Sequence, residues 1–257
     1  MLIERGYFTA LKQLVEKMYE ENDNTKVSLL VASQGGPVSL YFLTRLVTQD
    51  WKDTYIDTYI PLAAAFAGGS HLIHILLTGP VILSGTAVDE VDTRDEDRTI
   101  PAIYWLIPHA SFWNDTVLVV TPSRNYTAND YKELFADVGY PQGYEQFKIS
   151  ENDLEVPSPN VSTHCIYGVG FPTPLSFVYG EGFPDERPEV VYGDGDSVVN
   201  RESLETCLRW TNSSYPLKNT VFYGIASHES AVTDVEVLQL IGSIVGAPVD
   251  PVDGKSS

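Results

Sequence analysis

The stretch LLVASQGG, residues 29–36, leads from an apolar run through Ser33 to a pair of glycines. The preceding run KVSLLVA, residues 26–32, is almost continuously apolar, as expected of a strand that is covered by helices on both faces. After the glycines, PVSLYFLTRLV, residues 37–47, predicts a helix, and proline is well tolerated in a first helical turn. This order of strand, tight turn and helix places Ser33 at the turn.

Strands and helices continue to alternate along the chain. A helix begins at Tyr7 and is ended by the polar run ENDNT, residues 21–25. Further strands are predicted at residues 55–64, 116–122, 164–170, 188–196 and 219–226, and further helices at residues 129–139, 201–209 and 233–245. Such alternation is typical of a mostly parallel sheet. With 257 residues and 43% hydrophobic residues, the chain is long enough for one α/β domain over residues 1–257.

The chain is acidic, with 16 Lys and Arg residues against 35 Asp and Glu residues and a net charge of -19. This charge repels phosphate backbones and anionic membranes, which argues against a nucleic-acid partner. The apolar stretch at residues 59–83 is interrupted by prolines, glycines and histidines, so no transmembrane segment is predicted there. The acidic segment DEVDTRDEDR, residues 89–98, is expected to be mobile, and it lacks the glycine and the terminal glutamate of a calcium-binding EF-hand loop.

Two features favour a secretory route. Four Asn-x-Ser/Thr glycosylation sequons occur, at Asn114, Asn125, Asn160 and Asn212. The two cysteines, Cys165 and Cys207, are compatible with one disulfide or with two buried thiols.

The N-terminus disagrees with this route. Glu4 and Arg5 lie where a signal peptide needs an apolar core, so no secretory signal is predicted in this chain. Either the protein is cytosolic or its sequence continues upstream.

Ser33 is a candidate nucleophile only as one member of a set. A serine hydroxyl needs a histidine base and a third group that orients this base. In the G-x-S-x-G turn of serine hydrolases, small neighbours allow close packing around the serine. Ala32 and Gly35 are small, whereas Val31 stands at the position of the first glycine. The local pattern therefore leaves a nucleophile and an ordinary loop serine both open.

The acid and the base are expected after later strands. Asp194 and Asp196 lie in YGDGDSVV, directly after a predicted strand, and Asp196 is chosen as the acid. The alternative for this segment is a turn or an ion site. His228 follows the predicted strand at residues 219–226 and is chosen as the base, whereas each of the other histidines, His71, His74, His109 and His164, is expected to be structural. No metal site is predicted, because His71 and His74 lack further ligands.

Several longer stretches resemble the lecithin:cholesterol acyltransferase family, and most closely its lysosomal phospholipase A branch. They are LYFLTRLVTQDWKDTYIDTYIPLAA, NDTVLVVTPSRNYTANDYKELFADVGY, CIYGVGFPTP and YGDGDSVVN. The resemblance runs from about Tyr7 to about Val245. It implies an α/β-hydrolase fold, with a mostly parallel sheet and helices on both faces. It also implies a lysosomal or extracellular enzyme that needs no cofactor and passes acyl groups from phospholipids, at a membrane or lipoprotein surface, to water or to a lipid alcohol.

Carried over residue by residue, the resemblance assigns Ser33 as nucleophile, Asp196 as acid and His228 as base. It also implies a disulfide between Cys165 and Cys207. The backbone N–H of Gln34 is expected to be one donor of the oxyanion hole, which is the pair of N–H groups that binds the charged oxygen of the reacting ester.

The chain departs from the family pattern at three places. Val31 replaces a small residue, and AAAFAGG, residues 63–69, replaces the family's GAPWGG. Only about 25 residues precede the strand before Ser33, so the first strands of the sheet and the second oxyanion donor are expected to be missing from this chain. The sequence is therefore expected to be a truncated gene model, a splice form or a C-terminal fragment of a longer protein. The alternatives to a phospholipase and acyltransferase are a catalytically impaired homologue with a lipid-binding or vestigial role and a cytosolic esterase.

Overall fold

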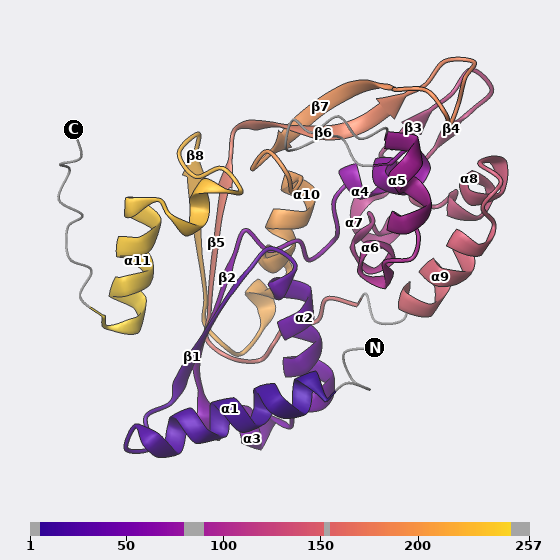
Figure 1. Cartoon of the computed structure of the whole chain (residues 1–257). Helices are drawn as coiled ribbons and strands as arrows, with labels where there is room; N and C mark the ends of the chain where they lie inside the picture. Colours follow the sequence, from indigo (N-terminus) through magenta and orange to yellow (C-terminus); the bar gives the residue numbers. More distant parts are fainter. Residues whose placement is uncertain (1–5, 80–89, 152–154, 248–257) are drawn as a thin grey trace.

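The computed structural model describes residues 6–79, 90–151 and 155–247. Its main sheet, sheet A, has the strand order β1-β2-β5-β8, and every neighbouring pair is parallel (Figure 1). Its strands are β1 (Val27–Ala32), β2 (Ile56–Leu62), β5 (Thr163–Val169) and β8 (Leu217–Tyr223). The predictions of a parallel sheet and of these four strands are confirmed.

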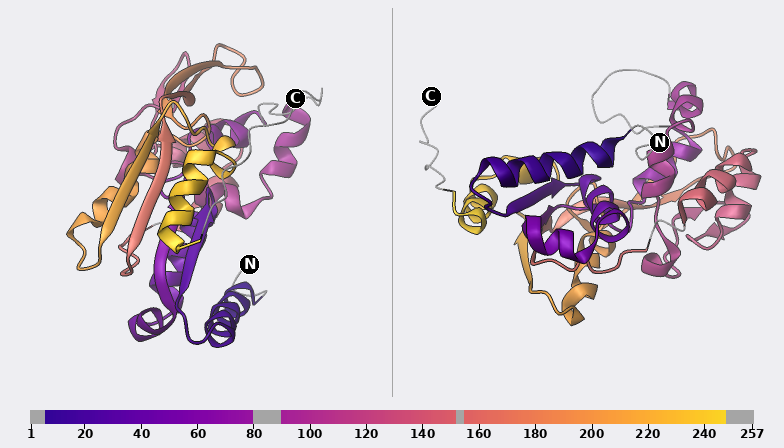
Figure 2. Two further views of the ribbon diagram at one scale, coloured as in Figure 1. Left: turned by 90° about the vertical axis from the view of Figure 1, so that its left-hand side faces the viewer. Right: turned by 90° about the horizontal axis from the view of Figure 1, so that it is seen from below.

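Helices cover both faces of sheet A. Successive residues of its strands therefore pack into two different apolar cores, one on each face. Tyr59 and Tyr167 lie in the core that holds α1 (Tyr7–Glu21) and α2 (Gly35–Tyr41), whereas Ile60 and Ile166 pack with α11 (Val235–Val245). Figure 2 shows α1 and α11 beside this sheet from two further directions. The alternation follows from strand geometry, since successive side chains point to opposite faces.

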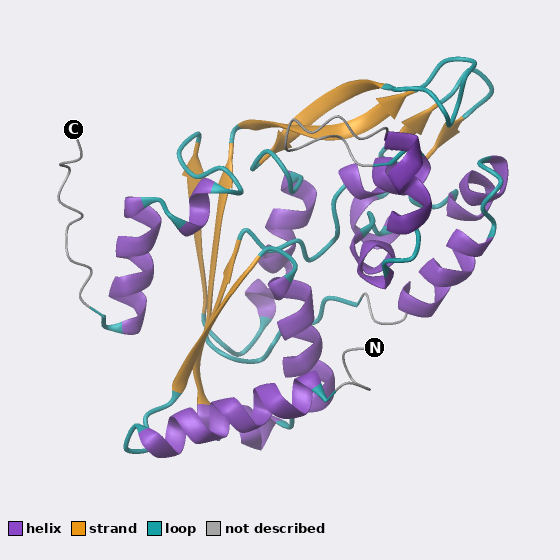
Figure 3. Ribbon diagram, in the orientation of Figure 1, coloured by secondary structure: helices purple, strands orange, loops and turns teal. Residues whose placement is uncertain are grey.

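Sheet A is the mostly parallel sheet that the sequence predicts, but two of the predicted strands lie in a second sheet. A second sheet, sheet B, has the order β4-β3-β6-β7, and only β3 and β6 run parallel in it (Figure 3). Its strands are β3 (Val119–Val120), β4 (Asn125–Tyr126), β6 (Phe171–Val178) and β7 (Glu189–Gly195). The predicted strand at residues 116–122 is reduced to β3, and the predicted strand at residues 188–196 is β7, which pairs antiparallel with β6. The chain runs from β5 through Gly170 directly into β6, so one extended segment links the two sheets.

A group of short helices packs against sheet B around its own apolar core (Figure 1). They are α4 (His71–Leu77), α5 (Glu90–Asp97), α6 (Pro101–Leu106), α7 (Ala110–Trp113), α8 (Tyr131–Asp137) and α9 (Gln142–Glu151). In the acidic segment that is expected to be mobile, residues 90–97 form the helix α5, while Asp89 lies outside the described residues. Arg94 and Arg98 anchor this segment through hydrogen bonds to the Leu77 and Leu76 carbonyls.

The helices predicted at residues 37–47, 201–209 and 233–245 agree in position with the structure, whereas α3 and η3 were not predicted. Helix α2 continues into a π-helical turn, η1 (Phe42–Leu46), and α3 (Gln49–Tyr55) leads into β2. The helix predicted at residues 201–209 is α10 (Arg201–Leu204) followed by a 3₁₀ helix, η2 (Glu205–Asn212), and a further 3₁₀ turn, η3 (Ser230–Val232), precedes α11.

Cys165 of β5 and Cys207 of η2 form a disulfide that is buried in the core between sheet A and these helices. Three of the four sequon asparagines, Asn114, Asn125 and Asn160, are exposed. Asn212 ends η2, and its side chain lies outside the description. In the described ranges, none of the helices has both the length and the apolar character needed to cross a membrane.

Candidate active site

Ser33 lies on a tight turn between β1 and α2. Its φ of 52° lies in the left-handed region, which non-glycine residues rarely adopt and which is found mainly where surrounding structure enforces it. The surrounding bonds are main-chain hydrogen bonds: Ser33 N–H donates to the Leu62 carbonyl at 3.0 Å, and the Ser33 carbonyl accepts from Gly36 N–H at 3.0 Å. The turn therefore holds Ser33 at the carboxyl end of β1.

The two glycines after Ser33 have different steric roles. A Cβ atom on Gly36 would lie 2.4 Å from the Ala64 Cβ, so a side chain has no room there. A Cβ atom on Gly35 would lie 3.4 Å from the Val31 Cβ, at the edge of ordinary contact. Val31, which replaces the first glycine of the family's turn, is accommodated beside Gly35 without distortion of the turn.

Asp196 is fully buried, and its carboxylate is held by main-chain N–H groups. Its Oδ1 atom accepts hydrogen bonds from Val199 N–H at 2.7 Å and from Val198 N–H at 3.1 Å. The turn closes with a bond from Asp196 N–H to the Val199 carbonyl at 3.1 Å. These bonds leave the Oδ2 atom free to meet a further partner.

That partner is His228, which follows β8. The Nδ1 atom of His228 lies 2.7 Å from Asp196 Oδ2, and its Nε2 atom lies 2.9 Å from Ser33 Oγ. The main chain adds a bond of 2.7 Å from His228 N–H to the Asp196 carbonyl. Ser33, His228 and Asp196, which the sequence analysis placed after three different strands, thus form one continuous chain of hydrogen bonds.

This arrangement suits nucleophilic chemistry. An Nδ1–H that donates to Asp196 leaves the Nε2 lone pair of His228 directed at the Ser33 hydroxyl, as removal of its proton requires. The peptide N–H of Gln34 lies at the N-cap of α2, where N–H groups have no partner within the helix. It is the candidate oxyanion donor beside Ser33.

The other residues considered in the sequence analysis lie outside this hydrogen-bonded chain. Asp194 accepts from Gly170 N–H at 2.7 Å and pairs with Arg201 at 3.0 Å. His74 is buried and lies 3.1 Å from the Tyr179 hydroxyl, and a structural role for it stays a prediction. No group of three or more potential ligands among the described residues is arranged to hold a metal ion.

His71 lies close to the site, although its position in an apolar stretch indicated a structural role. Burial, and then the neighbouring charge of His228, lower its pKa to about 4. The signal in the sequence is the pair Gly68 and Gly69 just before it, because Gly69 leaves room for the imidazole ring.

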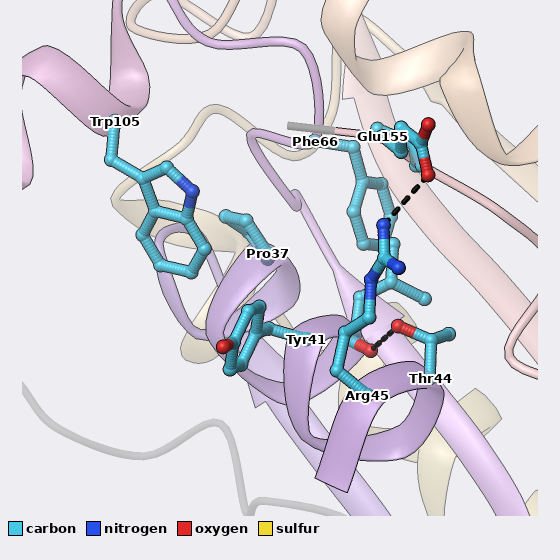
Figure 4. A pocket seen from close by; sticks show the side chains of 9 residues that line it. Pro37, Tyr41, Thr44, Arg45, Phe66, Trp105 and Glu155 are labelled. Atoms are coloured by element: carbon cyan, nitrogen blue, oxygen red, sulfur yellow. Dashed lines mark hydrogen bonds and ion pairs between the residues drawn. The ribbon is translucent and has the colours of Figure 1, made fainter. Parts of the chain in front are cut away.

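A small recess lies on the outer side of α2 and η1. Its lining includes Leu40, Thr44 and Phe66. Figure 4 shows the Pro37 and Tyr41 rings beside the Trp105 indole, and the ion pair of 2.6 Å between Arg45 and Glu155. None of the three residues of the hydrogen-bonded chain lines this recess, so we assign it no part in the chemistry.

A serine on a strained strand-to-helix turn, with an acid and a histidine that follow later strands beside a parallel sheet, defines an α/β-hydrolase. The family model for lecithin:cholesterol acyltransferase matches residues 4–241, so the chain belongs to this family.

Curated relatives agree with this family. The lysosomal phospholipase A and acyltransferase of Mus musculus is 37% identical over 211 residues, which are 79% of this chain and 49% of that protein. The phosphatidylcholine-sterol acyltransferase of Gallus gallus is 37% identical over 80% of this chain and 50% of its own length. The lecithin-cholesterol acyltransferase-like 1 protein of Arabidopsis thaliana is 37% identical over 90% of this chain and 52% of its own length. The chain therefore spans about half the length of the curated relatives it matches.

Solved structures support the fold. A chain in the crystal structure of the Tle4-Tli4 complex superimposes with a TM-score of 0.57 over 91% of this chain and 62% of its own length, at 14% sequence identity. At this identity the likeness is one of fold alone.

Proposed function

We propose that this protein is a serine-dependent acyl hydrolase and O-acyltransferase that acts on glycerophospholipids. The observation that carries the proposal is the chain of hydrogen bonds from Ser33 Oγ through His228 to Asp196. The family and the printed names of the relatives suggest the substrate class, because they include a phospholipase A and a phosphatidylcholine-sterol acyltransferase.

In the proposed reaction, Ser33 Oγ attacks the ester carbonyl carbon while its proton passes to Nε2 of His228. Asp196 stabilises the imidazolium that forms, and the Gln34 N–H is one donor to the oxyanion. His228 then gives the proton to the departing lysophospholipid oxygen, which leaves the acyl group on Ser33. Water or a lipid hydroxyl attacks this ester and loses its proton to His228. The bond between the acyl carbon and Ser33 Oγ then breaks, His228 returns the proton to Ser33 Oγ, and the acyl group leaves as a fatty acid or an ester of the lipid alcohol. Each step uses side chains of this protein and needs no cofactor.

The decisive experiment is fluorophosphonate labelling of the 257-residue chain, with the adduct mapped by mass spectrometry. An adduct on Ser33 that is lost in Ser33→Ala and in His228→Ala supports the proposal. His164→Ala is the matched control, because His164 lies near the start of β5 and Ser33 follows the end of β1 in the same parallel sheet. A folded chain that gives no adduct would favour the alternative, a catalytically impaired homologue with a lipid-binding or vestigial role.

Substrate and acceptor are tested next with phosphatidylcholine liposomes. Release of fatty acid measures transfer to water, and formation of an acylated product after addition of a lipid alcohol measures transfer to that acceptor. Both products should vanish in Ser33→Ala. If the protein is labelled at Ser33 but cleaves only soluble esters, the assignment of Ser33 as nucleophile stands and the proposed phospholipid substrate is refuted.

We further propose a lysosomal or extracellular location. The exposed sequon asparagines and the disulfide support it, since both modifications belong to the secretory route. Glycan at Asn125 or Asn160 in protein from its native cells would agree with this location. Unmodified asparagines together with reduced cysteines would favour a cytosolic esterase.

A further inference from the structure

Thr173, near the start of β6, is fully buried, and its hydroxyl group makes two hydrogen bonds. It donates to the Phe171 carbonyl at 3.0 Å, and it accepts from the N–H of Ser197 at 2.9 Å. A hydroxyl group has one proton and two lone pairs, so it can fill both roles at once. Thr173 thereby contacts the residue that directly follows Asp196.

Three successive main-chain N–H groups follow Asp196, and they have different acceptors. Those of Val198 and Val199 donate to Asp196 Oδ1 at 3.1 and 2.7 Å. The N–H of Ser197 donates to Thr173 instead. The Thr173 bond therefore joins the start of the turn to β6, while the next two N–H groups hold the carboxylate.

The backbone of Ser197 needs such a contact. Its φ of 88° lies in the left-handed region, which residues other than glycine rarely adopt. A conformation of this kind persists where the surrounding structure enforces it. Because Thr173 binds the N–H of this same residue, it is one of the contacts that enforce the turn.

The close approach of Thr173 to the turn requires a glycine at position 195, the last residue of β7. A Cβ atom on Gly195 would lie 2.6 Å from Thr173 Oγ1 and closer still to the Val199 carbonyl oxygen. A side chain there would push the hydroxyl group away from the turn or open the turn itself. The packing around Gly195 thus leaves the Thr173 hydroxyl group directly against the turn.

We propose that Thr173 is a positioning residue for the reaction, whose hydroxyl group holds the turn at residues 196–199 so that Asp196 stays directed at His228. The bond that a displaced turn would disturb is the one of 2.7 Å between Asp196 Oδ2 and His228 Nδ1. The proposal rests on the proposed function, because it assigns Thr173 a part in catalysis through Asp196.

Thr163 provides a matched control. It is also a buried threonine in a strand, and its hydroxyl group also donates to the carbonyl two residues earlier, that of Val161, at 3.0 Å. It lies at the start of β5, whereas Ser33 follows the end of β1 in the same parallel sheet. Valine at either position removes a donated bond of the same kind, but Thr173→Val also removes the acceptor of the Ser197 N–H.

The test compares Thr173→Val, Thr173→Ser and Thr163→Val with the wild type, all in the full chain. Thr173→Val removes the acceptor with little change in shape, whereas Thr173→Ser keeps the hydroxyl group. Two quantities are measured on folded protein. They are the rate of fluorophosphonate labelling of Ser33, and the low-field proton resonance of the His228 Nδ1–H that is bonded to Asp196.

In Thr173→Val, we expect the labelling rate to fall roughly ten- to a hundredfold, because a misplacement of about 1 Å can cost about a hundredfold. The His228 resonance should broaden or shift upfield, which a purely structural role of Thr173 would not cause. Thr173→Ser should recover most of both quantities. Thr163→Val should lower thermal stability without moving either.

Two outcomes at these positions would refute the role of Thr173 while the proposed function stands. One is a Thr173→Val variant that keeps the wild-type rate and resonance. The other is an equal change in Thr163→Val, which would show that loss of a buried hydroxyl group anywhere in the strands has this effect. If Thr173→Val does not fold, Thr173→Ala is compared with Thr173→Ser, since these two variants differ only in the hydroxyl group, and equal rates and resonances would refute the role.

Failure of the proposed function itself has a different signature. If the wild type shows the resonance but no labelling, the proposed function fails, and the resonance of Thr173→Val alone decides the role of Thr173. Absence of the resonance from the wild type would overturn the positioning role, because no bond between His228 and Asp196 would then exist to be held.

Discussion

Asp194 and Asp196 are two residues apart but have different partners, so their neutral variants should behave differently. Asp196→Asn keeps an oxygen for the Val198 and Val199 N–H groups but turns an amide toward His228, which favours the wrong tautomer. We expect the labelling rate to fall about 10⁴-fold with little loss of stability. Asp194→Asn, which affects the contacts with Gly170 and Arg201, is the matched control. Equal losses in the two variants would contradict the assignment of Asp196 as the acid.

The two glycines of the turn provide a second matched pair. Gly36→Ala would place a methyl group 2.4 Å from the Ala64 Cβ, so we expect it to lower the free energy of unfolding by about 1–3 kcal/mol, as overpacking does. Gly35→Ala, with 3.4 Å to the Val31 Cβ, should be tolerated better. Chemical denaturation of both variants measures the difference. A more severe effect at Gly35 would mean that the turn packs differently.

The titration of His71 predicts how stability depends on pH. The pKa of about 4 in the folded chain lies below the usual value of 6.5, so between these pH values the unfolded chain binds a proton that the folded chain does not. The free energy of unfolding should therefore fall as pH drops from about 6.5 to about 4, by on the order of 3 kcal/mol for this group. Denaturation at several pH values should show a smaller fall in His71→Gln. Parallel curves would refute a neutral, buried His71.

The sequence indicated the three candidate residues of the site, but it gave less information about the residues that surround them. Ser33, Asp196 and His228 were selected because each follows a predicted strand, and the family resemblance made the same selection. His71 was not selected, because its proximity to His228 and Asp196 joins residues that are distant in sequence. A contact between residues this far apart in the sequence produces no periodic residue pattern from which it could be predicted.

At the scale of elements, the strands of sheet A were the easiest to predict. β1, β2 and β5 have apolar runs and were found at nearly the correct residues, whereas β8, which begins with Leu217, Lys218 and Asn219, was predicted two residues late. β6 was missed because Pro172 and Pro174 argue against a strand, yet a bulge between Pro174 and Ser176 accommodates the pairing with β7. The placement of β7 in sheet B could not be predicted, because alternation along the chain does not specify which sheet a strand joins.

The disulfide provides a prediction about how elements are held together. It joins β5 to η2 across a separation of 42 residues. Closing a loop of this length restricts the unfolded chain, so the double variant Cys165→Ala/Cys207→Ala should lose about 4 kcal/mol of unfolding free energy. Urea denaturation measures the loss. A reductant should destabilise the wild type and leave the double variant unchanged. Wild-type stability in the double variant would contradict this contribution.

At the scale of the whole molecule, the three residues of the site come from both sheets. The cores on either side of sheet A support Ser33 and His228 at the ends of its strands, whereas Asp196 follows β7 of sheet B. The site therefore forms where the two sheets meet, and Gly170 links β5 to β6 at this place. The sequence predicts a mostly parallel sheet, whereas the meeting of two sheets at the site follows from tertiary packing that local patterns do not encode.

The net charge of -19 makes a prediction about lipid surfaces that is independent of the site. If the protein works on phospholipid bilayers, its charge should repel bilayers that contain anionic lipid at neutral pH, and salt should screen this repulsion. We therefore expect weaker cosedimentation with anionic vesicles than with pure phosphatidylcholine vesicles at pH 7 and low salt. Salt should reduce the difference, and so should a lower pH, because protonation of carboxylates and histidines makes the chain less negative. Ser33→Ala should behave as the wild type does, since the repulsion needs no catalysis. Tighter binding to anionic vesicles at pH 7 would mean that a local basic surface overrides the net charge.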